Sequence, residues 1–218
     1  MLAGCSAAPV SDLAGNGSEA SSVTTKRKPP LAKMSFAGGA VVVAGPEGYC
    51  LDPETSASSA GRGIAVIASC LILSDGKVGI YVAPVIVTVT IGPRATVQDL
   101  PDAAALAEAA GTDLLAGGMR DGLVVAHLAS GGDAMLDEGD TRYWRGAFIE
   151  GERAVGLALY APKGDALAGE RGVVMLEKVR ASIRRAGSGK PVAVVDAKTT
   201  TTLEKPRQNK MFSRLFGS

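Results

Sequence analysis

"TRYWRGAFIEGERAVGLALYA", residues 141–161, carries the clearest signal for the fold of this chain. Apolar and polar residues alternate on both sides of the segment EGE at 150–152, which is typical of two strands that each bury one face. Gly151 at the turn tolerates the positive φ that a tight connection needs. The stretch therefore predicts an antiparallel hairpin, around which the rest of the chain can be interpreted.

Four further segments predict strands. They are rich in β-branched and small apolar residues and end at turn-forming residues. They cover residues 38–45, 63–73, 79–91 and 121–129. In the long segment 79–91 the odd-numbered residues from Val85 to Ile91 are apolar and share one face, which predicts one buried face and one partly exposed face.

An Ala-rich segment at 98–118 predicts the first helix. Asp99 is suited to cap its N-terminus, and Gly117 with Gly118 is suited to end it. The chain then returns as the predicted strand 121–129, so this helix lies in the middle of the domain.

A second helix is predicted over 166–186, near the end of the folded region. Its apolar residues recur at a spacing of three or four, which places them on one stripe: Val173, Leu176, Val179 and Ile183. Together these elements predict an α+β fold, in which an antiparallel or mixed sheet carries a central helix and a C-terminal helix packed on it.

The composition limits the partners of the protein. Hydrophobic residues make up 46% and charged residues 21%, which is ordinary for a globular protein, whereas aromatic residues reach only 4%. The net charge of +1 gives no general attraction to nucleic acid, so we expect no nucleic-acid partner. No apolar stretch approaches the roughly 20 residues that span a bilayer, so we expect membrane association only through an anchor.

Residues 2–5, LAGC, resemble the lipobox of bacterial lipoproteins, in which lipid is attached to the cysteine. Only Met1 precedes the motif, so we expect that the start codon lies upstream or that the signal segment was removed. The predicted organisation is a signal remnant at 1–5, a disordered tether at 6–35, an α+β domain at 36–186 and a flexible tail at 187–218.

The lipobox places the protein in the bacterial cell envelope. Lipid on Cys5 would make the membrane a partner of the protein and leave the domain facing the periplasm. Ser6 follows the cysteine where Asp would retain a lipoprotein in the inner membrane of enteric bacteria, so the outer membrane is slightly favoured.

The chain has three cysteines. If Cys5 carries lipid, Cys50 and Cys70 remain as a pair, and an oxidising envelope allows them to form a disulfide. The alternative is two buried free thiols that act as small apolar side chains. A thiol-redox role is not expected, because the chain contains no Cys-x-x-Cys motif.

Residues 41–53, VVVAGPEGYCLDP, resemble the opening of PsbP-like domains, with Pro46, Gly48 and Tyr49 after a strand. The later strand pair and the long C-terminal helix fit the same group, which includes DcrB-like and LpqN-like lipoproteins. The resemblance covers about 36–186 and implies an αβα sandwich, anchored by lipid and without an established enzymatic activity. The alternative is an unrelated α+β sandwich with the same order of elements.

Catalytic and metal-binding residues are not expected. His127, the only histidine, lies in the predicted strand 121–129, where an interior or cross-strand position is the expected one. The loop 131–140 gathers four acidic residues without the spacing of a calcium loop, which predicts a solvated turn: Asp133, Asp137, Glu138 and Asp140. We therefore expect no metal and no cofactor.

The end of the chain is a candidate docking segment for a protein groove or a membrane surface. Its four large apolar residues would share one face of a helix: Met211, Phe212, Leu215 and Phe216. The alternative is that this segment packs back on the domain.

These observations favour a non-catalytic envelope lipoprotein that acts as a binding or scaffolding module in the periplasm. Two alternatives stay open: a small enzyme that uses His127 and the acidic loop, and a carrier of an apolar ligand in a pocket lined by the Val- and Ala-rich sheet.

Overall fold

The computed structural model describes residues 28–59 and 61–189 of the chain. In this part, eight strands form one sheet with the order β3-β5-β6-β10-β9-β8-β7, and β4 pairs with β5 beside this path. All of these pairs are antiparallel. The strands are β3 Tyr49–Leu51, β4 Ala57–Ser59, β5 Arg62–Ser69, β6 Ile86–Arg94, β7 Leu114–Arg120, β8 Leu123–Leu128, β9 Tyr143–Glu150 and β10 Arg153–Tyr160.

A separate hairpin and a few helices complete the described part of the chain. The hairpin strands β1 and β2 pair antiparallel with each other. The bounds are β1 Lys33–Phe36, β2 Val41–Ala44, α1 Cys70–Leu73, α2 Ala103–Glu108 and α3 Gly172–Gly187, with 3-10 turns η1 Ala37–Gly39, η2 Val97–Asp99 and η3 Gly132–Ala134. An α+β fold with an antiparallel sheet and a C-terminal helix is thus confirmed, although the fold is richer in sheet than predicted.

Residues 141–161 contain the predicted hairpin. β9 and β10 pair without interruption, joined by a turn at Gly151 and Glu152. These two residues have φ of 52° and 57°, the left-handed conformation that matches a two-residue turn to the twist of its strands. Because β10 also pairs with β6 and β9 with β8, the hairpin forms the middle of the sheet.

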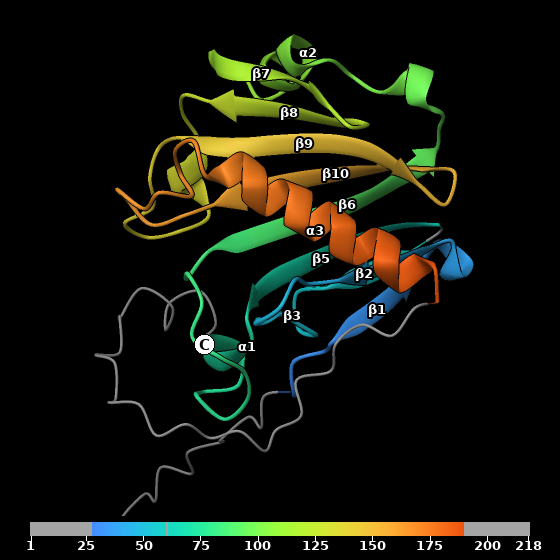
Figure 1. The fold of residues 1–218 in the computed structure, drawn as a ribbon, viewed down its shortest axis with the longest axis vertical. Coiled ribbons are helices and arrows are strands. Elements are labelled where there is room, and N and C mark those ends of the chain that lie inside the picture. Colours follow the sequence, from blue (N-terminus) through green and yellow to red (C-terminus); the bar gives the residue numbers. More distant parts are fainter. Residues whose placement is uncertain (1–27, 60, 190–218) are drawn as a thin grey trace, which may run out of the picture.

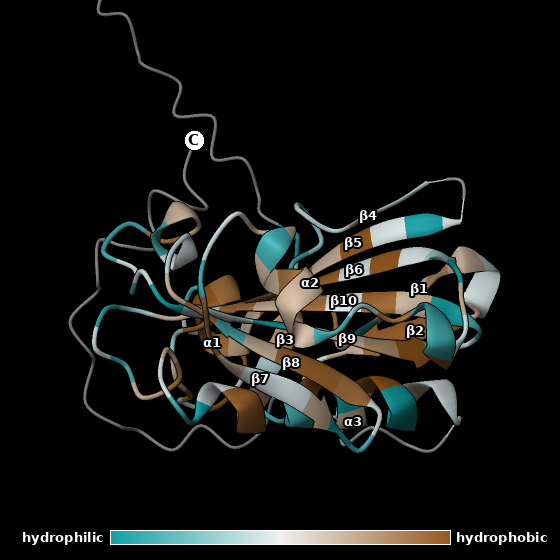
Figure 2. Cartoon of the chain, turned by 90° about the horizontal axis from the view of Figure 1, so that it is seen from above, coloured by the Kyte–Doolittle hydropathy of each residue, from teal (hydrophilic) through white to brown (hydrophobic). Residues whose placement is uncertain are grey.

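One face of the sheet, here called the α3 face, carries the main hydrophobic core. α3 lies diagonally across it, with the β1–β2 hairpin beside the helix (Figure 1). Figure 2 shows the hydrophobic residues of β2 and β8 in brown. The predicted stripe of the C-terminal helix is buried in this core, which confirms its orientation: Val173, Leu176, Val179 and Ile183.

The opposite face, here called the α2 face, has smaller apolar clusters. Ala103 and Ala107 of α2 pack on Ala126 and Leu128 of β8. Elsewhere on this face Leu136 packs with residues of β5 and β6. The predicted division into one buried face and one partly exposed face holds for β6, where Val87, Val89 and Ile91 are buried while Thr88 and Thr90 of the other face are not.

The predicted strand 63–73 is wrong in its last third. β5 ends at Ser69, and Cys70 begins the short helix α1 instead of lying inside a strand. The amide of Cys70 donates to the carbonyl of Gly48 at 2.9 Å, and the amide of Ser74 donates to the carbonyl of Cys70 at 3.0 Å. The second bond joins residues four apart and closes a helical turn, so the chain leaves the sheet at Cys70.

The predicted strand 79–91 starts too early. β6 begins at Ile86 and continues to Arg94. Pro84 has no amide hydrogen for a ladder. The preceding carbonyl, that of Ala83, accepts a hydrogen bond of 2.9 Å from the hydroxyl of Tyr49. Residues 79–85 are therefore a loop.

The predicted helix 98–118 is mostly wrong. α2 covers only Ala103–Glu108, and its N-cap is Asp102, whose carboxylate accepts from the amide of Ala105 at 2.8 Å. Asp99 instead forms a capping box with Thr96 on η2. The chain turns at Gly111, which has a φ of 67°, and the residues that were expected to end the helix lie in β7.

The predicted helix 166–186 begins later, at Gly172. A Cβ at this position would lie 2.2 Å from Cδ1 of Trp144, so glycine allows the first turn of α3 to approach β9 closely. Residues 166–171 form hydrogen-bonded turns instead. In the described part of the chain no helix combines the length and the apolar character that crossing a membrane requires.

Candidate functional site

Several predicted functional residues lie outside the described ranges. They are the lipid-attachment residue Cys5 and the docking residues of the tail, Met211, Phe212, Leu215 and Phe216. The predicted tether, except residues 28–35, and the predicted tail, except residues 187–189, also lie outside them. The roles assigned to these residues stay predictions.

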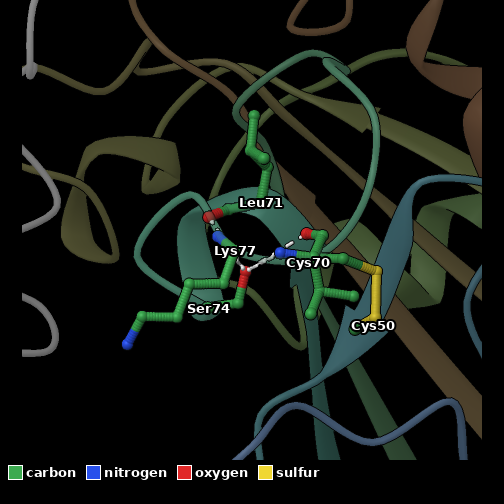
Figure 3. Close-up of a disulfide and its surroundings, with 6 residues drawn as sticks. Cys50, Cys70, Leu71, Ser74 and Lys77 are labelled. Carbon is green, nitrogen blue, oxygen red and sulfur yellow. Dashed lines mark hydrogen bonds between the residues drawn. A yellow bond between two sulfur atoms is a disulfide. The ribbon is translucent and has the colours of Figure 1, made fainter. Parts of the chain in front are cut away.

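The predicted disulfide is present. Cys50 in β3 and Cys70 at the start of α1 are joined, with their Cα atoms 4.8 Å apart (Figure 3). The residue before each cysteine also pairs across the sheet, Tyr49 opposite Ser69. The bond therefore fixes the short strand β3 to the end of β5.

Ser74 holds the loop that follows the disulfide. Its Oγ accepts hydrogen bonds from the amides of Lys77 at 3.2 Å and Val78 at 2.8 Å (Figure 3). The loop then presents two large apolar side chains to solvent, Ile80 with 44% and Tyr81 with 74% of its surface exposed. This corner of the molecule is thus a rigid, partly apolar surface.

His127 is buried on the α3 face, as predicted for an interior position. Its Nε2 lies 2.9 Å from the carbonyl oxygen of Ala168, and because that oxygen can only accept, Nε2 carries the proton. The ring stacks on Trp144 with centroids 4.5 Å apart. Trp144 in turn donates to the carbonyl of Gly169 at 2.8 Å. The two side chains hold the segment before α3, and these contacts supply no carboxylate of the kind that orients a catalytic histidine.

The acidic loop is organised around Asp140. Its carboxylate accepts from the Nε and Nη2 of Arg142 at 3.0 and 3.1 Å and from the amide of Gly164 at 3.1 Å. The hydrogen bonds from Arg142 and from the backbone hold the pKa of Asp140 well below its usual range. The carboxylate of Asp140 is thus committed to fixing the loop.

The other acidic residues of this loop line a hollow of about 550 Å³, together with Lys163: Asp133, Asp137 and Glu138. Within residues 28–59 and 61–189 no group of three or more His, Cys, Asp or Glu side chains is placed to hold a metal ion. Asp140, the most buried carboxylate of the loop, is tied to an arginine. The arrangement offers a polar surface but no ligand set.

A second hollow, of about 390 Å³, lies where β4, β5 and β6 meet. Ile64 on β5, with 41% of its surface exposed, and Thr90 on β6 contribute to its lining. If the protein carries an apolar ligand, this hollow is where the described residues offer it room.

The sequence did not predict the most exposed apolar element, β7. Its residues LLAGGMR follow an Ala-rich segment, and the first five of them, 114–118, were assigned to the end of a helix. Leu114, Leu115 and Met119 are all exposed on this strand. The pair Gly117–Gly118 inside an apolar segment was the available signal, because glycine inside a strand often marks the close approach of another backbone.

Searches with protein-family models, among curated proteins and among solved structures found no match to this chain.

Proposed function

We propose that this protein is a non-catalytic binding or scaffolding module of the bacterial cell envelope, anchored by lipid on Cys5 and facing the periplasm. The LAGC motif at residues 2–5 supports the anchor, and Ser6 favours the outer membrane.

The observation that carries this proposal is the disulfide between Cys50 and Cys70. Disulfides persist in oxidising compartments such as the periplasm and are rare in the cytosol, where thiols are kept reduced. The same bond uses up the two cysteines of the domain, so that Cys5 is the remaining thiol of the chain. Both facts are compatible with a lipoprotein that has an extracytoplasmic domain, and they support the proposal.

Three features of the domain support a binding role over a catalytic one. The only histidine is engaged with Ala168 and Trp144, and the buried carboxylate of the acidic loop is engaged with Arg142. Exposed large apolar side chains lie next to one another at two places, the loop that contains Tyr81 and the strand β7, whereas Ile64, Val97 and Val174 are exposed singly. Exposed apolar side chains on structured elements are typical of surfaces that contact a partner.

A PsbP-like fold is the finer form of the proposal. The antiparallel sheet, α3 on one face and the segment from Val41 to Pro53 are consistent with it. The short α2 provides only a small cover on the opposite face, where an αβα sandwich would have a helical layer.

The test is the intact mass of the protein purified from its native host, from the membrane fraction and the soluble fraction separately. We expect a membrane-bound species that begins at Cys5, carries diacylglyceryl and acyl groups and is lighter than the reduced chain by the two hydrogens lost in the disulfide.

The matched control is Cys5→Ser, expressed from the same locus. It should move to the soluble fraction and lose the lipid mass while it keeps the Cys50–Cys70 bond. A wild-type protein that is soluble, begins at Met1 and has free thiols would contradict the proposal.

A further inference from the structure

β7 forms one edge of the sheet and is widely exposed. Within residues 28–59 and 61–189, β8 is the only strand that pairs with it, and Figure 1 shows it as the outermost strand on its side of the sheet. All of its residues except Gly118 are exposed. The exposed fractions are 39% for Leu114, 50% for Leu115 and 55% for Met119. The outer side of β7 thus combines backbone hydrogen-bonding positions that no described strand pairs with and large apolar side chains.

This edge has little of the usual protection against pairing with another chain: its charged residue, Arg120, lies at the end of the strand, and its register against β8 shifts near the start, between Leu114 and Ala116. Native edge strands commonly carry a charged residue, a proline or a covering segment. Residues 114–119, LLAGGM, contain no charged residue and no proline. α2 packs on the flat face of β7 and β8, where a Cβ on Gly117 would lie 2.6 Å from the Cβ of Ala103. The edge is therefore open to an extended chain.

Gly118 is compatible with such pairing. It has a φ of 150°, which side chains rarely adopt, and a Cβ there would meet no atom within 4 Å. The packing of the described chain therefore leaves the space beside Gly118 unfilled. Glycine at such a position lets another backbone approach closely.

From these features we propose that β7 is a docking edge for a second copy of this chain, which pairs antiparallel with it about a two-fold axis at Gly117. The two sheets would then be continuous across the dimer. The inference does not depend on the proposed lipid anchor, because it rests only on the described domain.

The sequence of β7 is complementary to itself in this arrangement. The register of β7 against β8 shifts between Leu114 and Ala116. In the proposed dimer the outer side of β7 pairs without this shift, so that residues at equal distances from the axis face each other and Leu115 of one copy lies opposite Met119 of the other. Arg120 of one copy comes opposite Leu114, one residue from Asp113, so that the basic end of each strand lies beside the acidic start of the other. An isologous pair repeats each favourable contact twice.

The size of the contact sets the expected strength. Seven residues of strand, Leu114–Arg120, give a small interface, at the low end of the roughly 1,200–2,000 Å² that stable complexes bury. We therefore expect a dimer that forms and dissociates with concentration in the micromolar range, not an obligate one.

The experiment is sedimentation velocity of the full oxidised chain from low micromolar to several hundred micromolar concentration. The weight-average mass should rise from that of one chain toward that of two. Leu115→Lys and Met119→Glu should each keep the protein monomeric over the same range, because each places a charge without an oppositely charged partner in the apolar middle of the contact, whereas Arg120 lies at its end near Asp113. The control variants Val174→Lys and Val97→Glu change exposed apolar residues elsewhere and should dimerise like the wild type.

Mixing the two β7 variants, Leu115→Lys and Met119→Glu, tests the register. The lysine introduced into one chain would face the glutamate introduced into the other, while the unchanged Leu115 and Met119 still meet on the second half of the contact. An equimolar mixture should therefore regain at least the wild-type dimer fraction. Thermal unfolding checks that each variant is folded. We expect all four to be folded, because the replaced side chains are exposed.

Four outcomes would overturn the proposal. They are a wild-type protein that is monomeric at every concentration, a dimer that survives both β7 variants, dissociation of the control variants as well, or β7 variants that are monomeric alone and do not associate when mixed. A wild type that is monomeric at every concentration would mean that the partner of β7, if it has one, is an extended segment of another protein. A dimer that survives both β7 variants would mean that the dimer contact lies on another surface.

Discussion

At one edge of the sheet β3 is three residues long and is covered by its own chain, whereas at the other edge β7 is seven residues long and exposed. Leu31 and Leu51 exchange two backbone hydrogen bonds, of 2.9 and 2.8 Å, on the side of β3 away from β5. The Cys50–Cys70 bond then fixes β3 covalently. Among the described residues β7 has neither a segment that pairs with its outer side nor a disulfide. β4, which pairs with the other end of β5 on the same side, is also only three residues long, so this edge is short throughout and its β3 half is covered and crosslinked, whereas β7 is longer and exposed.

The largest expected effect is on the edge that contains β3. Replacing both cysteines, Cys50→Ala with Cys70→Ala, removes a crosslink over a sequence separation of 20. Loop-entropy estimates give a loss of about 3 kcal/mol in the free energy of unfolding. Urea denaturation of the wild type and the double variant measures it. Adding reductant should lower the free energy of unfolding of the wild type to that of the double variant, and it should leave the value of the double variant unchanged. If reductant does not change the free energy of unfolding of the wild type, and the double variant is as stable as the wild type, the disulfide does not stabilise this edge.

A smaller effect is expected where α2 supports β7. Gly117→Ala would place a Cβ 2.6 Å from both the Cβ of Ala103 and the carbonyl oxygen of Val125, and the resulting overpacking should cost about 1–3 kcal/mol. Gly156→Ala in the central strand β10 is the control, because its Cβ would lie 3.8 Å from Thr90, an ordinary contact. Thermal unfolding should show a lower Tm for the first variant only. Equal Tm values would mean that α2 is free to move away from β7.

The smallest effect concerns Tyr49 in β3. Burial, and then the negative charge of Asp165, raise the pKa of its hydroxyl to about 12. In the unfolded chain a tyrosine ionises near pH 10, so the unfolded state loses its proton first as the pH rises. The stabilising contribution of neutral Tyr49 is therefore complete below about pH 10 and declines as the pH rises from there toward 12.

Tyr49→Phe should remove this part of the alkaline loss of stability, and it should also remove the share of Tyr49 in the tyrosinate absorbance that develops late, to which Tyr160 also contributes because burial raises the pKa of its hydroxyl as well. A tyrosine spectrum that titrates completely near pH 10 in the folded protein would contradict the burial of Tyr49. It would also weaken the contrast between the two edges, because Tyr49 would then be open to solvent.

Local signals were sufficient for the middle of the sheet. The hairpin 141–161 was predictable because alternation and the turn at Gly151 act within a few residues. The stripe from Val173 to Ile183 was predictable for the same reason, since helical spacing is a property of the segment itself. The pairing of Cys50 with Cys70 was expected on compartment and count, and the structure contains it.

The errors share a different physical cause. Cys70 was placed in a strand because CLIL is apolar, yet its hydrogen bonds to distant Gly48 and local Ser74 place it in a helical turn. The sequence predicted an interior position for His127. It did not predict the hydrogen bond to Ala168, because this residue is distant from His127 in the sequence. Such contacts depend on where other elements lie, which no local pattern encodes.

The sequence by itself determined the elements whose stability is local, which are the central hairpin and the amphipathic face of the C-terminal helix, and the count of its cysteines indicated the pair Cys50 and Cys70. Only the tertiary structure decided that LLAGGMR is a strand and that it lies at a bare edge. This segment has no alternation of its own, and its ladder with β8 supplies the hydrogen bonds that an isolated chain would make with water. Whether a strand lies at an edge depends on which other strands pair with it, and this is a property of the assembled sheet.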